Sequence, residues 1–177
     1  MKNREGLFAF DNLFAGGHML MTVIHYGLLI ALAIALIFAA VTDIQRRQID
    51  NWLNAGIALG APGFWWASGL SLWPDVAYQL GIAVLAFGFF AGLFALRLMG
   101  GGDVKLLTAL ALWIEPNAFL QLLLIMALAG CALTIVMGAY HFLQQQKERL
   151  AIPYGVAIAF GALWVLFPKL IAVPSFA

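Results

Sequence analysis

The stretch Arg97–Trp113, RLMGGGDVKLLTALALW, places three glycines, an aspartate and a lysine between two apolar runs. The chain around it is strongly apolar: 64% of its 177 residues are hydrophobic and 10% are charged, whereas about a quarter are charged in an ordinary soluble domain. Several runs approach or exceed the roughly 20 apolar residues that a helix needs to cross a bilayer. The sequence therefore predicts an all-α integral membrane protein of one domain, in which an acid beside a span needs an explanation.

Six apolar segments are expected to be transmembrane helices: Thr22–Val41, Trp52–Leu72, Val76–Leu98, Val104–Ile114, Ala118–Phe142 and Ile152–Val173. The second contains Pro62 and three tryptophans, so we expect it to be kinked or to lie partly in the membrane interface. The first is too long for a signal-peptide core and is expected to be retained. The predicted organisation is a tail over residues 1–21 and a six-helix membrane domain over residues 22–173.

The fourth segment, Val104–Ile114, is short. Its 11 residues would span about 17 Å as a helix, against about 30 Å of hydrocarbon. Either Gly100–Asp103 or Glu115–Asn117 is therefore expected to dip into the membrane. Irregular backbone at that depth is tolerated only where protein or a water-filled cavity covers it.

The distribution of Lys and Arg predicts the orientation, because cytoplasmic loops are enriched in both. The loops after the first, third and fifth segments carry six of them, and the opposite side carries three: Arg46, Arg47, Arg97, Lys105, Lys147 and Arg149 against Lys2, Arg4 and Lys169. This count favours both termini outside and the three basic loops in the cytoplasm.

Composition argues against several other classes of protein. A net charge of +1 gives no reason to expect nucleic acid. The single cysteine, Cys131, can build neither a disulfide framework nor a CxxC zinc site. His25 and His141 lack a spaced third ligand and are weak evidence for a metal. No metal or cofactor is expected, and the oligomeric state stays open.

Asp43 and Asp103 are the acids that matter, because each abuts an apolar segment. Glu5, Asp11, Asp75 and Glu115 fall on the outer side as solvated charges, and Glu148 lies among loop cations. One crossing out and one back separate Asp43 from Asp103, so both are expected at the same membrane face. If the Pro62 segment did not cross, they would face opposite sides.

Two carboxyls held close cannot both ionise easily, so such a pair shares one proton. One member can then act as a base toward water while the other protonates a leaving amine, as in aspartic proteases. The alternative is that both acids mark the interface or pair with nearby Arg and Lys.

The glycines favour the catalytic interpretation. Gly100–Gly102 permit close backbone approach and a positive φ just ahead of Asp103. Asp103 would lie at a helix N-terminus near Lys105, and both features favour its ionised form. On this argument Asp103 is expected to be the more acidic partner.

Three motifs of functional interest occur in order along the chain. TDIQRRQIDNWLN has an Asp at the end of a span followed by Arg, Ile and Asn, which fits Asp43, Arg47, Ile49 and Asn51 or Asn54. GGGDVK contains Gly100, Gly102, Asp103 and Lys105, and IPYGVAIAFGAL contains Pro153, Tyr154 and Gly155. Together they resemble the motifs of the type IV prepilin peptidases, a family of GxGD aspartic peptidases.

The resemblance implies an inner-membrane aspartic endopeptidase that needs no cofactor, with Asp43 and Asp103 as catalytic residues. Its substrates would be prepilins or pseudopilins, whose short cationic leader is cut at the cytoplasmic face, and its surroundings membrane lipid. The larger family members carry two CxxC pairs in an insert and also methylate the new N-terminus. This chain resembles the short form associated with Flp pilins and tight-adherence secretion, so methylation is not expected.

Two other classes stay open. A proton- or ion-coupled transporter subunit would place its acids along a path through the bilayer. A non-enzymatic assembly factor of a secretion system would not need Asp43 or Asp103. Arg47 and Lys105 are also open to two interpretations, as positive-inside anchors or as residues that support the site.

Overall fold

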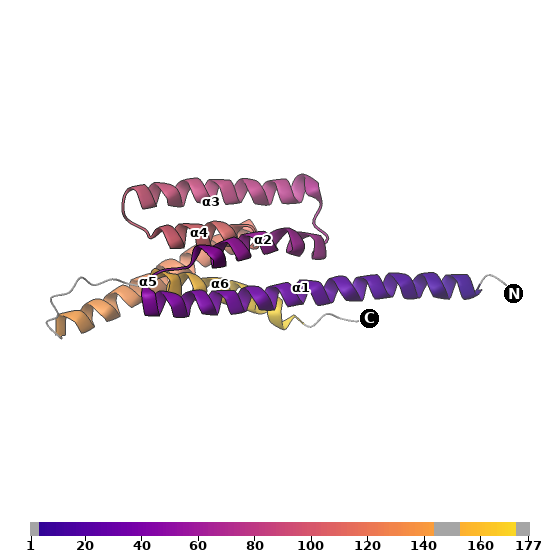
Figure 1. Cartoon of the computed structure of the whole chain (residues 1–177), viewed down its shortest axis with the longest axis horizontal. Coiled ribbons are helices and arrows are strands. Elements are labelled where there is room, and N and C mark those ends of the chain that lie inside the picture. Colours follow the sequence, from indigo (N-terminus) through magenta and orange to yellow (C-terminus); the bar gives the residue numbers. More distant parts are fainter. Residues whose placement is uncertain (1–3, 144–152, 173–177) are drawn as a thin grey trace.

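The structure, a computed structural model, describes residues 4–143 and 153–172 (Figure 1). Its regular elements in this part of the chain are all helical. They are α1 (Arg4–Arg46), α2 (Asn51–Ala67), the short distorted turn η1 (Leu72–Val76), α3 (Ala77–Ala95), α4 (Gly101–Ala111), α5 (Pro116–Leu143) and α6 (Tyr154–Ile171).

Each of the six predicted segments corresponds to a helix. Four helical stretches are long and apolar enough to cross a membrane: Met19–Arg46, Leu72–Ala95, Pro116–Tyr140 and Tyr154–Ile171. The other two, α2 with 17 residues and α4 with 11, are shorter. The helix α2 runs through Pro62 without a break and ends at Ala67, five residues earlier than predicted.

The helix α1 is longer than the predicted first span. It runs without interruption from Arg4 to Arg46, so no break in the helix marks the predicted boundary between residues 21 and 22. Residues 152 and 173, at the ends of the predicted sixth span, lie outside the described residues.

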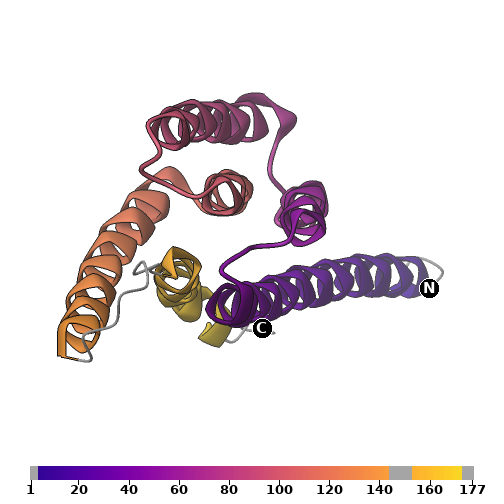
Figure 2. The same cartoon turned by 60° about the vertical axis from the view of Figure 1, so that its left-hand side comes forward.

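The short helix α4 is the centre of the bundle. Figure 2 shows it, in pink, enclosed by the longer helices, and it packs against α2, α3, α5 and α6. Six of its 11 residues are buried: Val104, Leu106, Leu107, Ala109, Leu110 and Ala111. A helix buried over most of its surface is expected to be mainly apolar, and the polar residues Lys105 and Thr108 of α4 lie on its less buried side.

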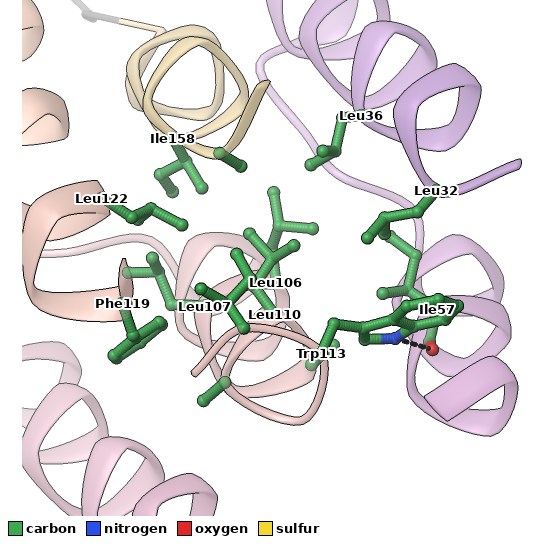
Figure 3. Close-up of a cluster of buried hydrophobic side chains, with 14 of the residues drawn as sticks. Leu32, Leu36, Ile57, Leu106, Leu107, Leu110, Trp113, Phe119, Leu122 and Ile158 are labelled. Carbon is green, nitrogen blue, oxygen red and sulfur yellow. Dashed lines mark hydrogen bonds between the residues drawn. The ribbon is translucent and has the colours of Figure 1, made fainter. Parts of the chain in front are cut away.

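Side chains of α4 form the middle of the core (Figure 3), where Leu106, Leu107 and Leu110 are fully buried among residues of α1, α5 and α6. Because lipid tails are as apolar as leucine, helices in a membrane associate through close packing rather than through removal from water. Gly161 of α6 is an example. A Cβ there would lie 2.9 Å from the carbonyl oxygen of Leu122 on α5, so these helices touch backbone to backbone.

The C-terminal end of α4 is covered by polar side chains of its neighbours. A helix leaves its last carbonyls without partners. Gln79 of α3 donates through Nε2 to the carbonyls of Ala111 and Ile114, both at 2.7 Å, and Trp65 Nε1 of α2 donates to Leu112 O at 2.7 Å. The turn after α4 is thus covered by protein, as short helices at membrane depth require.

Candidate active site

Asp43 and Asp103 line one pocket of about 450 Å³ where the end of α1 meets the start of α4. The other residues that line this two-aspartate pocket are Arg47, Gln48, Ile49, Asp50, Asn51, Gly100, Gly101 and Gly102. The two acids therefore lie at the same end of the bundle, as the count of crossings predicted. The alternative, in which Asp43 and Asp103 lie at opposite membrane faces, is therefore excluded.

Asp43 is held by the first turn of α6. Its side chain is 6% exposed, and the N–H of Gly155 donates to Oδ2 at 2.7 Å. A Cβ at Gly155 would lie 2.8 Å from Oδ2 and 2.9 Å from Cγ. Only glycine fits here without displacing the carboxyl, although 112 residues separate the two in sequence.

Asp103 lies in the first turn of α4 against the glycines that precede it. A Cβ at Gly100 would lie 2.9 Å from Asp103 Oδ2, and one at Gly102 would lie 3.2 Å from the Cβ of Ile49. Close approach is therefore the reason for glycine at these two positions.

The expected positive φ at the glycines is wrong. Gly100 is extended, with φ −72° and ψ 143°, and the helix begins at Gly101. Among the described residues only Arg47, Gly69 and Arg97 have positive φ. The three glycines leave room for neighbouring residues because they lack a side chain, and none of them adopts a left-handed backbone conformation.

The electrostatics of Asp103 also differ from expectation. Burial, and then the negative charge of Asp43, raise its pKa to about 6, against a weaker opposing effect of the Gly100 backbone hydrogen bond. Lys105 does not bind it, because Nζ donates instead to Asn51 Oδ1 at 2.7 Å. Loss of water and a like charge outweigh the helix dipole, so Asp103 is not the strongly acidic partner that its position suggested.

The remaining predicted residues divide into two groups. Arg47 and Asn51 line the two-aspartate pocket. Lys105 does not line it but donates a hydrogen bond to Asn51, which does. Pro153 and Tyr154 do not line it. The ring of Tyr154 lies instead against Gly130 of α5, where a Cβ would come within 3.2 Å of it. Of the third motif, Gly155 donates to Asp43, and the backbone of Val156 interacts with the same carboxyl.

Two further residues belong to this region. Asp50 lies outside the sequence prediction; it stands at the N-cap of α2 without a side-chain cap hydrogen bond and 4.0 Å from Arg46 Nη2. Asn54, which the second motif offered only as an alternative to Asn51, is 4% exposed. Its Nδ2 donates to Gly102 O at 3.3 Å. The sequence signal that could have identified Asn54 is its position one helical turn after Asn51.

Within the described part of the chain, no group of three or more His, Cys, Asp or Glu side chains could hold a metal ion. The two-aspartate pocket is a polar cavity with room for water, and two carboxyls line it. One of them, Asp103, has a pKa of about 6. Such a pair can move protons to and from a bound substrate.

A comparison with protein families matches residues 30–137, more than half of the chain, to the type IV leader peptidase family. The match contains both aspartates and the three glycines and ends before Pro153. No curated protein and no solved structure matches the chain. With a family match of this extent, the chain belongs to the type IV leader peptidase family.

Proposed function

We propose that this protein is a membrane aspartic endopeptidase that uses Asp43 and Asp103 to remove the cationic leader from prepilins or pseudopilins. Family membership makes it a peptidase of the prepilin type. The observation that supports these two residues as its catalytic pair is their position in one pocket, where the charge of Asp43 helps to raise the pKa of Asp103 to about 6.

The chemistry follows from one shared proton. Asp43, as the base, takes a proton from water, whose oxygen attacks the carbonyl carbon of the scissile peptide. Asp103, as the acid, gives its proton to the amide nitrogen when the carbon–nitrogen bond breaks. The hydrogen bond from Gly155 to Asp43 Oδ2 keeps the base in one orientation, and precise orientation is a large part of enzymatic rate enhancement.

We propose that cleavage takes place at the cytoplasmic face of the bacterial inner membrane. The excess of Lys and Arg in the loops on the aspartate side supports this orientation, with six crossings over residues 22–173 and both termini outside. A prepilin changes there from a charged leader to an apolar helix, and the acids would stand at that boundary.

The substrate subclass is proposed from the short form of the chain. With one cysteine in 177 residues, the chain lacks the CxxC pairs of the methylating peptidases. We therefore propose Flp-type prepilins as substrates and cleavage without methylation.

The experiment is co-expression of the protein with candidate prepilins, followed by leader removal on a gel. Wild type should shorten the prepilin, and Asp43→Asn and Asp103→Asn should not. Asp75→Asn and Glu115→Gln, which keep the same change of charge outside the pocket, should cleave normally. Cleavage that survives in both pocket variants would favour an assembly factor and end the catalytic proposal.

A further inference from the structure

A second cavity, of about 290 Å³, adjoins the two-aspartate pocket and shares Asn51 with it. It is a groove with α4 as its floor and with α2 and α3 on either side, the arrangement visible around the pink helix in Figure 2. We call it the α2–α3 groove; its lining includes Asn54, Ala55, Ala58, Phe87, Lys105 and Thr108.

The groove has the length of about three residues of an extended peptide. Along α4 it runs from Lys105 to Leu112, about 10 Å at the rise of a helix. On the α2 side the groove is lined by the small side chains of Ala55 and Ala58. Small residues let a transmembrane segment approach closely. Ala55 is exposed and Phe87 is 52% exposed, so the groove is open at the molecular surface.

Asn54, which lines the groove, has a buried side-chain oxygen without a hydrogen-bond partner among the described residues. Asn54 is 4% exposed, and its Oδ1 accepts no hydrogen bond within the part of the chain that the structure describes. A buried amide oxygen without a donor costs about 1–3 kcal/mol, so an acceptor left in this state points to a donor that arrives from outside. Its Nδ2 meanwhile binds the carbonyl of Gly102 beside Asp103.

We propose that the α2–α3 groove binds the apolar segment of the substrate that follows the cleavage point. Asn54 Oδ1 accepts a backbone N–H that becomes free when this segment unwinds. This inference rests on the proposed peptidase function. A peptide fits better than a lipid tail, because an acyl chain brings no N–H for Asn54. The groove also adjoins the two-aspartate pocket at Asn51.

The first test fills the groove and compares two substrates. Ala55→Trp is paired with Ala132→Trp, which adds the same bulk at an exposed alanine of α5. One substrate is a membrane-embedded prepilin, and the other is a soluble peptide that contains the leader and ends one residue beyond the cut, so that it does not reach the groove. Ala55→Trp should raise KM for the prepilin at least tenfold and leave peptide cleavage within twofold, whereas Ala132→Trp should change neither.

The second test does not depend on turnover. In a Cys131→Ser background, Ala55→Cys should form a disulfide with a prepilin that carries a single cysteine in its apolar segment, and Ala132→Cys should not. If Ala55→Trp misfolded and cleaved neither substrate, the crosslink alone would decide whether the groove binds the apolar segment.

The outcomes separate the two proposals. A wild-type protein that cleaves no prepilin would refute the peptidase function itself. A wild-type protein that cleaves, an Ala55→Trp variant that matches its control, and no crosslink at any substrate position would refute the groove alone.

Discussion

The two ends of the bundle both hold ionisable residues in a pocket, but they arrange them differently. At the end opposite the aspartates, a pocket of about 350 Å³ contains His25, Asp75, Glu115 and Lys169. Lys169 Nζ binds Glu115 Oε1 at 2.8 Å, Ser71 Oγ donates to Asp75 Oδ2 at 2.8 Å, and His25 Nδ1 lies 3.0 Å from Ser68 Oγ. We call this the Lys169 pocket.

In the two-aspartate pocket both acids line one cavity, and among the described ion pairs neither Asp43 nor Asp103 takes part. Lys169 and Glu115 neutralise each other in place, whereas in the proposed function the like charges of Asp43 and Asp103 share one proton that can be transferred. The size of a pocket and its number of charges therefore do not identify a reactive site. The identity of the neighbour of each charge does.

After the aspartates themselves, the largest effect that separates the two ends should come from Gly155. In Gly155→Ala the new Cβ would lie 2.8 Å from Asp43 Oδ2, so the carboxyl must move. Because a displacement of about 1 Å can lower a rate by about 100-fold, we expect a loss of that order in kcat for leader removal. Gly138→Ala, where a Cβ meets nothing within 4 Å, is the matched control and should cleave normally. Equal rates for the two variants would show that the Gly155 contact does not position Asp43.

The pH dependence should come next in size. Asp103 is protonated below its pKa of about 6 and loses its proton as the pH rises through that value, which removes the acid. We expect kcat/KM to fall about tenfold per pH unit above pH 6, measured with a purified enzyme and one peptide substrate. Asp75→Asn should have the same profile. A flat profile between pH 6 and pH 8 would contradict this assignment of Asp103.

Asp103→Asn should also stabilise the fold, with a dependence on pH. A folded pKa of about 6 against a reference value of 3.8 means that ionisation of Asp103 destabilises the native state once the pH exceeds both values. This amounts to at most about 3 kcal/mol. We expect Asp103→Asn to raise Tm by about 5 °C at pH 8 and by much less at pH 4. An equal change at both pH values would show that Asp103 ionises normally.

The smallest effect should come from the Lys169 pocket. The side chains of Lys169 and Glu115 are 37% and 73% exposed, and exposed ion pairs contribute about 1 kcal/mol or less. Lys169→Met should therefore lower Tm only slightly and leave leader removal within twofold of wild type. A severe loss of cleavage in Lys169→Met would mean that the two ends are coupled.

The apolar runs predicted the helices well, because hydropathy reports directly which segments avoid water. All six predicted segments are helices, and four reach the length that a crossing requires. The number of crossings also predicted that Asp43 and Asp103 would meet. Helix ends were less predictable: α1 continues back to Arg4, where mixed polar and apolar residues leave no clear hydropathy signal.

Contacts between distant residues were beyond the reach of the sequence pattern. The raised pKa of Asp103 depends on burial and on a neighbour 60 residues away, while the helix N-terminus and Lys105, which are visible in the sequence, suggested the opposite. Three features depend on how α2, α4 and α6 pack. They are the hydrogen bond between Lys105 and Asn51, the glycines that give room without positive φ, and the Asn54 oxygen, which has no partner among the described residues.

The most direct test of the central claim, that Asp43 and Asp103 act as one unit, is the rate of leader removal by Asp43→Asn, Asp103→Asn and the double variant. Residues that share one proton have strongly non-additive effects. We predict that each single variant lowers the rate by about 1000-fold or more and that the double variant is no slower than the singles. A single variant that keeps the wild-type rate, or losses that multiply in the double variant, would contradict the account.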